Sequence, residues 1–151
     1  MTDWVPLVAG VLTAVAGGFY FAFSAVVMPA LRRRPSAEAG AAMVAINVQA
    51  VRAPFMIVFF GAAAASIGVL VVAVPDIQNG LPPLHAVGAV LSVLSWISTV
   101  AVNVPLNTRL GAASDRASAW DAFDRPWTRA NHLRTFLSVA GAVVLLYPWP
   151  A

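Results

Sequence analysis

Two short segments of the sequence place amide side chains and an arginine at regular spacing. Asn103 and Asn107 flank a proline in the segment NVPLNTRL. Asn131 and Arg134 follow Trp127 in the pattern W-x-x-x-N-x-x-R-T. Amide side chains both donate and accept hydrogen bonds, whereas a guanidinium only donates. Side chains of these kinds, brought to one place, are suited to hold an oxygen-rich or anionic group.

Each of these residues also has a purely structural interpretation. Asparagines near helix ends often satisfy free backbone groups, and arginines near helix ends extend toward lipid headgroups. Taken one at a time, a structural role is the more common one. Arg134 fits that role least, because Thr135 and Ser138 continue its polar face deeper into the helix.

The two segments lie at the ends of long apolar runs. The chain of 151 residues is 60% hydrophobic and 10% charged, whereas a soluble domain is about 25% charged. Four apolar runs are visible: Val5–Val27, Pro54–Val74, Pro83–Val102 and His132–Tyr147. A bilayer core needs about 20 apolar residues per helix. The first three runs reach that length, and the fourth does so if its helix begins upstream at Pro126.

The arginines predict how these helices are oriented. All nine basic residues are arginine, and they lie only between the first and second runs and between the third run and the start of the fourth. Short arginine-rich loops stay in the cytoplasm. We therefore predict an all-α protein with one domain over residues 1–151, a bundle of four transmembrane helices with both termini outside. The net charge of +3 then reflects topology and not a nucleic-acid partner.

Local signals refine this outline. The first cytoplasmic connection contains AEAGAAMVAINVQAVRA, which predicts a short amphipathic helix capped by Ser36. Pro54 is expected to kink this helix or to open the next one. Asp124 and Pro126 predict the start of the fourth helix, as N-cap and first-turn residue. Residues 75–82 are expected to form a short outside turn.

Helical phase predicts which side chains meet. At about 100° per residue, one face of the third helix collects polar and aromatic side chains; they are His85, Ser92, Ser95, Trp96, Thr99, Asn103 and Asn107. Polar side chains in membranes turn toward the bundle interior or a wet cavity. In the fourth helix, too, polar and aromatic residues share one face; they are Trp127, Asn131, Arg134, Thr135 and Ser138. We therefore predict a cluster at the cytoplasmic end, formed by Asn47, Arg52, Asn103, Asn107, Asn131, His132 and Arg134.

Within this cluster, Asn103 and Asn107 are expected to form one hydrogen-bonding unit with Arg134. Pro105 frees a backbone carbonyl near Ala101 and bends the helix so that both amides face one space. Asn131, one turn below Arg134, is expected to hold the guanidinium in place.

Other sites are excluded or explained by packing. Cysteine is absent, which excludes disulfides and thiolate metal sites. His85 and His132 should lie about 25 Å or more apart across the bilayer, so no metal or haem site is predicted. Tyr20 is expected to be a packed core residue, and Trp120 an interface anchor. The small residues of the first helix favour close helix packing, within the bundle or in a homo-oligomer.

Four segments together resemble the anthrone oxygenase-like family of small four-helix membrane proteins. They are VMPALRR after the first run, the Asn47 region, NVPLNTRL, and the W-x-x-x-N-x-x-R-T pattern. The resemblance covers nearly the whole chain. It implies a multi-pass protein of a bacterial plasma membrane that oxidises the methylene of an aromatic polyketide-type anthrone to a quinone carbonyl with dioxygen. It implies no metal or flavin cofactor.

The resemblance also suggests roles for residues of the cluster. His132 would be the catalytic base, since an imidazole titrates near neutral pH. Arg134, Asn103 and Asn107 would donate to the anthrolate oxygen. Phe55, Trp96 and Trp127 would enclose a flat ring, and the remaining substrate contacts would come from Asn47, Arg52, Asn131 and Thr135. Two other classes stay open: a small transporter that binds an organic anion, and an accessory membrane protein whose polar cluster is structural.

Overall fold

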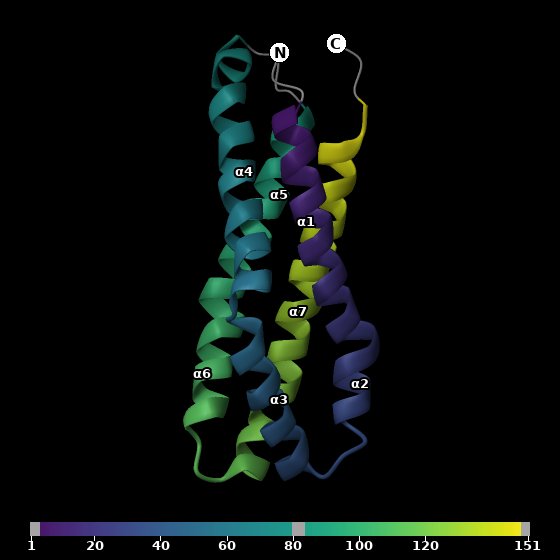
Figure 1. The fold of residues 1–151 in the computed structure, drawn as a ribbon, viewed down its shortest axis with the longest axis vertical. Helices are drawn as coiled ribbons and strands as arrows, with labels where there is room; N and C mark the ends of the chain where they lie inside the picture. The colour runs from purple at the N-terminus through teal and green to yellow at the C-terminus, as the bar shows by residue number, and fades with distance from the viewer. Residues whose placement is uncertain (1–3, 80–83, 149–151) are drawn as a thin grey trace.

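The computed structural model describes residues 4–79 and 84–148, and in these ranges the chain is helical apart from short turns (Figure 1). The helices are α1 (Trp4–Ala22), α2 (Met28–Leu31), α3 (Ser36–Ala50), α4 (Ala53–Gln78), α5 (Leu84–Ser98), α6 (Val104–Ala112) and α7 (Arg116–Leu146). Two π-helical turns, η1 (Phe23–Val27) and η2 (Thr99–Asn103), join α1 to α2 and α5 to α6. The all-α fold class is therefore confirmed.

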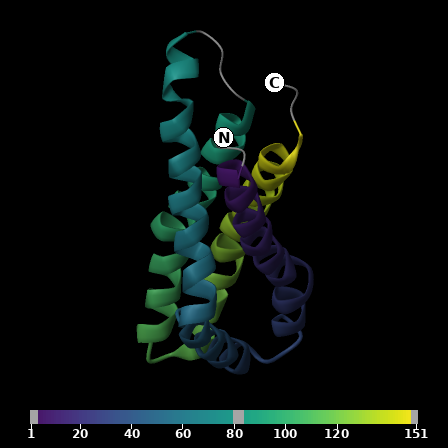
Figure 2. The ribbon, with the colours of Figure 1, turned by 45° about the horizontal axis from the view of Figure 1, so that its top comes forward.

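The helices form a long bundle in which α7 packs along both α1 and α5, and α4 packs on both α1 and α5. The helix α1 begins and α7 ends at one end of the bundle, which we call the terminal end (Figure 1). The turns after α2 and α6 lie at the other end, the turn end. There α3 packs against α7 and α6, beneath α4 (Figure 2). A four-helix cross-section thus continues through both halves of the bundle.

Three helices are long and apolar enough to cross a membrane: Trp4–Leu31, Ala53–Pro75 and Leu84–Ala112. Their outward faces carry exposed aliphatic and aromatic side chains, such as Val15, Ile57 and Val87. Such faces are expected against lipid. The helix α7 is not among the three, because its first half is rich in charged and polar residues.

The start of the fourth helix differs from the prediction. Helix α7 begins at Arg116, and its N-cap is Asp115, whose carboxylate accepts from the backbone N–H of Ala117 and Ser118 at 3.1 and 3.2 Å. The hydroxyl of Ser118 also donates to this carboxylate and lowers the pKa of Asp115. Asp124 does not cap the helix. It lies inside α7 and forms an ion pair with Arg32 at 2.9 Å, which raises the pKa of Arg32.

The first connection contains the expected helix, but Ser36 does not cap it. Ser36 is already the first residue of α3, and its hydroxyl donates to Asp121 of α7 at 2.8 Å. Pro54 lies in the first turn of α4, where its missing N–H costs no helical hydrogen bond. Helix α4 continues past Pro75 to Gln78, so the predicted turn starts later. Residues 80–83 lie outside the described residues.

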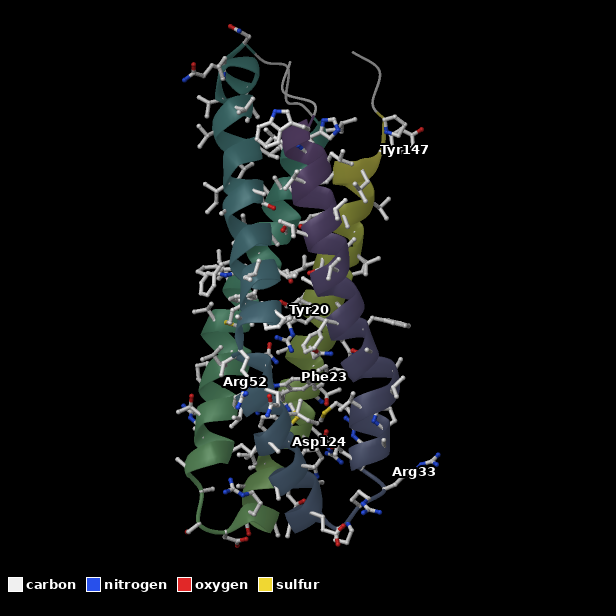
Figure 3. All side chains as sticks on the ribbon, in the orientation of Figure 1. Tyr20, Phe23, Arg33, Arg52, Asp124 and Tyr147 are labelled. Carbon is white, nitrogen blue, oxygen red and sulfur yellow. The ribbon has the colours of Figure 1, made fainter. Side chains whose placement is uncertain are left out.

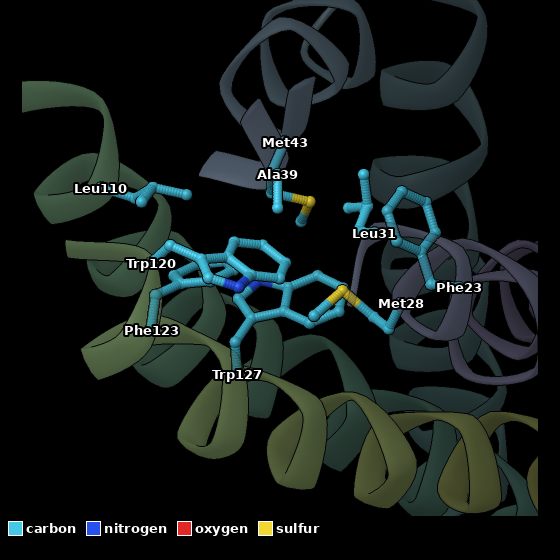
Figure 4. Packing of buried hydrophobic residues seen from close by; sticks show 9 residues of the cluster. All are labelled: Phe23, Met28, Leu31, Ala39, Met43, Leu110, Trp120, Phe123 and Trp127. Carbon is cyan, nitrogen blue, oxygen red and sulfur yellow. The ribbon is translucent and has the colours of Figure 1, made fainter. Parts of the chain in front are cut away.

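An aromatic core fills the turn end of the bundle (Figure 4). It consists of Phe23, Met28, Leu31, Ala39, Met43, Leu110, Trp120, Phe123 and Trp127. Trp120 is only 4% exposed, so the prediction of an interface anchor is wrong. The residues Ala39 and Met43 of α3 cover this part of α7 and bury the indole.

Small residues bring the helices together in the terminal half. A Cβ at Gly141 of α7 would lie 2.9 Å from the carbonyl oxygen of Gly88 in α5. Gly10 and Gly17 of α1 face side chains of α7 in the same way, whereas Gly18 has no neighbour within 4 Å. Most of these glycines therefore serve packing inside the chain. Association of two copies stays a prediction.

Candidate functional site

Two π-helical turns, each followed by a proline, border α7 near the middle of the bundle. In η1 the N–H of Met28 reaches back to the carbonyl of Phe23, and in η2 the N–H of Val104 reaches back to that of Thr99. Pro29 and Pro105 follow at once and cannot donate to the carbonyl four residues earlier. In a π-helical turn the hydrogen bonds reach five residues back, so the chain accommodates the missing N–H of the proline. Such turns occur frequently at functional sites.

Arg134 of α7 lies between these turns, and it is only 6% exposed. Its Nε donates to Asn131 Oδ1 at 2.9 Å, and its Nη1 donates to Thr99 Oγ1 at 3.4 Å. Its Cζ lies 4.2 Å from the ring centre of Tyr20 and 5.1 Å from that of Trp127. We call these five residues the Arg134 cluster. A guanidinium this close to two aromatic faces gains cation–π attraction from both.

No carboxylate among the described residues pairs with Arg134. The ion pairs in residues 4–79 and 84–148 are Arg32–Asp124 and Arg34–Glu38, both near the turn end. Likewise, no acceptor in these ranges takes a hydrogen bond from Nη2 of Arg134. The cluster therefore carries a positive charge inside the bundle, and Nη2 of Arg134, with both of its N–H groups, has no protein partner in the described part of the chain.

Asn131 ties the cluster to α1. Its side chain is fully buried, and its Nδ2 donates to the carbonyl of Tyr20 at 2.9 Å and to Ser24 Oγ at 2.7 Å. Its Oδ1 is the atom that accepts from Arg134. The predicted role of Asn131, to hold the guanidinium in place, agrees with this geometry. Thr135 donates to the carbonyl of Asn131 at 2.7 Å, a bond within its own helix.

Asn103 and Asn107 reach Arg134 only through Trp127, and not directly as the sequence predicts. Asn103 Nδ2 donates to the Trp127 carbonyl at 3.3 Å, and Trp127 Nε1 donates to Asn107 Oδ1 at 2.8 Å. The indole ring of Trp127 then faces the guanidinium. Asn103 is fully buried, and its Oδ1 has no partner among the described residues. A buried acceptor without a donor favours a bound water or ligand.

The region that carries these residues matches a family model described as Anthrone oxygenase, over residues 54–144. The chain belongs to the anthrone oxygenase family. The resemblance inferred from the sequence is thus confirmed, together with a helical membrane protein of this family. No curated protein and no solved structure matches the chain. The matched region includes η2, Trp127, Asn131 and Arg134, whereas Tyr20 and Ser24 precede it.

Other predicted site residues of this anthrone oxygenase family member are spread around the cluster. Phe55 packs on the tilted ring of Phe19 at 4.3 Å and is joined through Phe59 to Trp96, at 6.0 and 5.9 Å between ring centres. Trp127 packs instead on Phe23 and Phe123. Phe19 also packs on Phe23 at 5.1 Å between ring centres, so the three aromatic residues expected to enclose one ring are linked in one series of neighbouring rings.

Asn47 and Arg52 differ from each other in position. Asn47 lies on α3 with a buried Nδ2 that has no partner among the described residues. Arg52 is exposed in the turn between α3 and α4, and the structure gives it no contact with the cluster (Figure 3). The structure brings Asn131, Thr99, Trp127 and Arg134 together and leaves Arg52 outside.

His132 lies at the edge of the cluster, on the outer side of α7. Its ring is exposed, and its Nδ1 lies 3.0 Å from the hydroxyl of Ser24, which also binds Asn131. His132 is therefore connected to the guanidinium of Arg134 through the hydroxyl of Ser24 and the amide of Asn131.

Tyr20 and Ser24 are the site residues that the sequence does not reveal. Tyr20 is buried as expected, but it also covers the guanidinium of Arg134. The two residues are one turn apart and lie nine and five positions before Pro29, whereas Thr99 and Asn103 lie six and two positions before Pro105. The two apolar runs therefore share no spacing that would point to Tyr20 and Ser24.

Proposed function

We propose that this protein is a membrane oxygenase that converts the methylene of a planar anthrone-type substrate to a carbonyl with dioxygen, and that the Arg134 cluster binds the substrate oxygen. Membership of the anthrone oxygenase family supports the reaction class. The observation that carries the site assignment is the buried guanidinium of Arg134, which has no carboxylate partner among the described residues.

Electrostatics favours an anionic ligand at this position. Moving one charged group out of water costs on the order of several kcal/mol, and the charge must be compensated locally. The rings of Tyr20 and Trp127 and the oxygens of Asn131 and Thr99 compensate part of that cost. A delocalised oxyanion from the substrate would compensate more, by accepting a charge-assisted hydrogen bond from Nη2.

Dioxygen is the only co-substrate that the proposed reaction needs, and side chains of the protein stabilise the anion and accept the proton. Loss of one methylene proton leaves a carbanion whose charge spreads onto the ketone oxygen, where Arg134 stabilises it. The carbanion carbon forms a bond to dioxygen, and protonation gives a hydroperoxide. The O–O bond then breaks as the second proton leaves the carbon, so one oxygen becomes the new carbonyl and the other leaves as water.

His132 is the candidate for accepting the first proton. An imidazole is the side chain whose ordinary pKa suits proton transfer near neutral pH. In this proposal the substrate lies between Arg134 and the edge of the cluster at Ser24, where the ring of His132 is bonded. Replacing His132 with Gln keeps a polar side chain of related length and removes the base.

A structural role for the cluster is the second candidate. The amides of Asn131 and Asn103 bond to protein atoms on other segments, including the carbonyls of Tyr20 and Trp127. Such bonds stabilise a bundle whether or not a ligand binds. In that case each substitution would lower stability, and any loss of activity would follow unfolding.

The proposed function is tested with purified protein in lipid nanodiscs and a hydroxylated anthrone. Dioxygen consumption and quinone formation are followed together, against a protein-free control that measures spontaneous oxidation. We expect quinone and consumed dioxygen in equal amounts, a rate that a chelator does not change, and one atom of ¹⁸O₂ in the product. His132→Gln should lower the rate. A wild-type rate equal to the protein-free background would contradict the proposal.

We also propose that α7 is a fourth membrane span, with both termini outside, in a bacterial plasma membrane. The outer face of α7 changes from the exposed Arg125 and Arg129 to Leu133, Phe136 and Val143, which are also exposed. This change is expected where a helix enters lipid. The polar first half of α7 would then lie in the interface, next to α3.

A further inference from the structure

A small cavity lies inside the bundle beside the Arg134 cluster. Its volume is about 10 Å³, close to the ~10–15 Å³ that one water molecule needs. Six residues with polar groups line it, namely Thr13, Tyr20, Ser92, Ser95, Trp96 and Ser138. They come from α1, α5 and α7, in the half of the bundle where the candidate membrane spans run side by side.

Two pairs of hydroxyl groups border this cavity. Thr13 Oγ1 and Ser92 Oγ lie 2.8 Å apart, and Ser95 Oγ and Ser138 Oγ lie 2.7 Å apart. Ser95 also donates to the carbonyl of Arg134 at 3.0 Å. Because a serine has only one hydroxyl proton, Ser138 must be the donor within its pair. Ser138 Oγ then has a free lone pair that no described donor reaches.

One residue that lines the same cavity carries a donor without an acceptor. The indole Nε1 of Trp96 is buried and has no hydrogen-bond partner among the described residues. The pair of Thr13 and Ser92 also has two hydroxyl protons and uses one of them between its members. The cavity thus has unsatisfied donors and an unsatisfied acceptor, and burying such groups unpaired is costly.

We propose that this cavity is a water-binding site, in which one water accepts the indole N–H of Trp96 and donates to Ser138 Oγ. A water has two donors and two acceptors, so it also accepts the remaining proton of the Thr13–Ser92 pair. This single molecule satisfies groups from α1, α5 and α7. An apolar guest of the same size would leave all of them unpaired, which is why the occupant is water.

The water extends the hydrogen bonds of the Arg134 cluster toward the terminal end. It connects the Thr13–Ser92 pair to Ser138 and Ser95, and Ser95 reaches the carbonyl of Arg134. Thr99, which accepts from Arg134, donates to the carbonyl of Ser95 at 3.0 Å. The water site does not depend on the proposed oxygenase activity, because it is inferred only from the donors and acceptors of the residues that line the cavity.

The test is a structure determined from crystals at a resolution at which ordered waters are visible. We expect one water within about 2.7–3.2 Å of both Trp96 Nε1 and Ser138 Oγ. An empty cavity, or density that contacts neither atom, would overturn the proposal.

A pair of variants tests the role of the indole N–H. Trp96→Phe keeps an aromatic ring and removes the donor, so the water should lose its ordered position. Trp4→Phe, at an exposed tryptophan of α1, should leave it in place. An unchanged water in Trp96→Phe would contradict the assigned donor. If Trp96→Phe does not fold, the wild-type density alone decides.

Discussion

At the scale of single residues, Trp127 connects the two parts of the site. Its indole N–H binds Asn107, its carbonyl accepts from Asn103, and its ring faces the guanidinium of Arg134. The asparagines thus fix the tryptophan, and the tryptophan covers the charge. A substitution at Asn103 should therefore affect the surroundings of Arg134 through Trp127, although the two side chains share no hydrogen bond.

Asn103→Ala is predicted to reduce turnover of an anthrone per folded molecule by about tenfold, the value of one lost hydrogen bond. The physical reason is the buried Oδ1, which has no partner among the described residues and is open to a ligand. Thermal melting in detergent, measured on the same preparations, gives the folded fraction. Thr108→Ala is the control, since its hydroxyl bonds to Val104 of its own exposed helix turn. Lost stability with unchanged activity per folded molecule would leave only the structural role.

Residue types and helical phase are sufficient to predict much of this site. Ser92, Ser95, Thr99 and Asn103 of the third apolar run are all buried, as their shared face predicts. Asn131 and Arg134 are buried on one face of α7 for the same reason. The exact partners are not predictable in this way, because whether Asn103 meets Arg134 or Trp127 depends on how far η2 and α7 are displaced along each other.

At the scale of helices, glycines set how closely α5 and α7 approach. A Cβ at Gly141 would meet the carbonyl oxygen of Gly88 at 2.9 Å and the backbone nitrogen of Ser92 at 3.2 Å. Backbone atoms cannot rotate away as a flexible side chain does. The helices would have to separate, and this would strain the contacts of Ser92 and Ser95 beside the Arg134 cluster.

Gly141→Ala is predicted to destabilise the bundle by about 1–3 kcal/mol, the usual cost of overpacking. The measurement is the melting temperature in detergent. Gly18→Ala is the matched control, because a Cβ there has no neighbour within 4 Å and should leave the melting temperature unchanged. Equal melting temperatures for the two variants would contradict the close α5–α7 packing.

The boundaries of α7 show why helix ends are harder to predict than helix faces. Asp124 followed by Pro126 is a common helix start, but Asp115 provides the cap and both later residues lie inside α7. Asp124 has instead a distant partner, Arg32, and Trp120 is buried by α3. These contacts join segments far apart in the sequence, so a local pattern does not reveal them.

At the scale of the whole molecule, the arrangement of the bundle agrees with the distribution of arginine. The turns that carry Arg33 and Arg34 and the stretch from Arg109 to Arg116 lie at the turn end, away from the start of α1 and the end of α7 (Figure 1). Arginine-rich loops stay in the cytoplasm. The turn end is therefore the end that we propose to be cytoplasmic.

This topology is predicted to give a clear pattern in cysteine labelling, since the chain has no cysteine of its own. Asn79→Cys and Pro148→Cys should react with a membrane-impermeant maleimide in intact cells. Ser114→Cys should react only after the membrane is opened. Labelling of Pro148→Cys only after opening would mean that α7 does not cross the membrane.

The central claim is that the guanidinium of Arg134 binds the substrate oxygen, and its most direct test is kcat/KM per folded molecule in Arg134→Lys. Lysine keeps the positive charge but lacks the planar fork that reaches Asn131, Thr99 and a ligand together. We predict a loss of at least about 100-fold, the usual effect of removing a transition-state donor. Arg129→Lys, exposed on the same helix, should keep the wild-type value. Wild-type kcat/KM in folded Arg134→Lys would contradict the account.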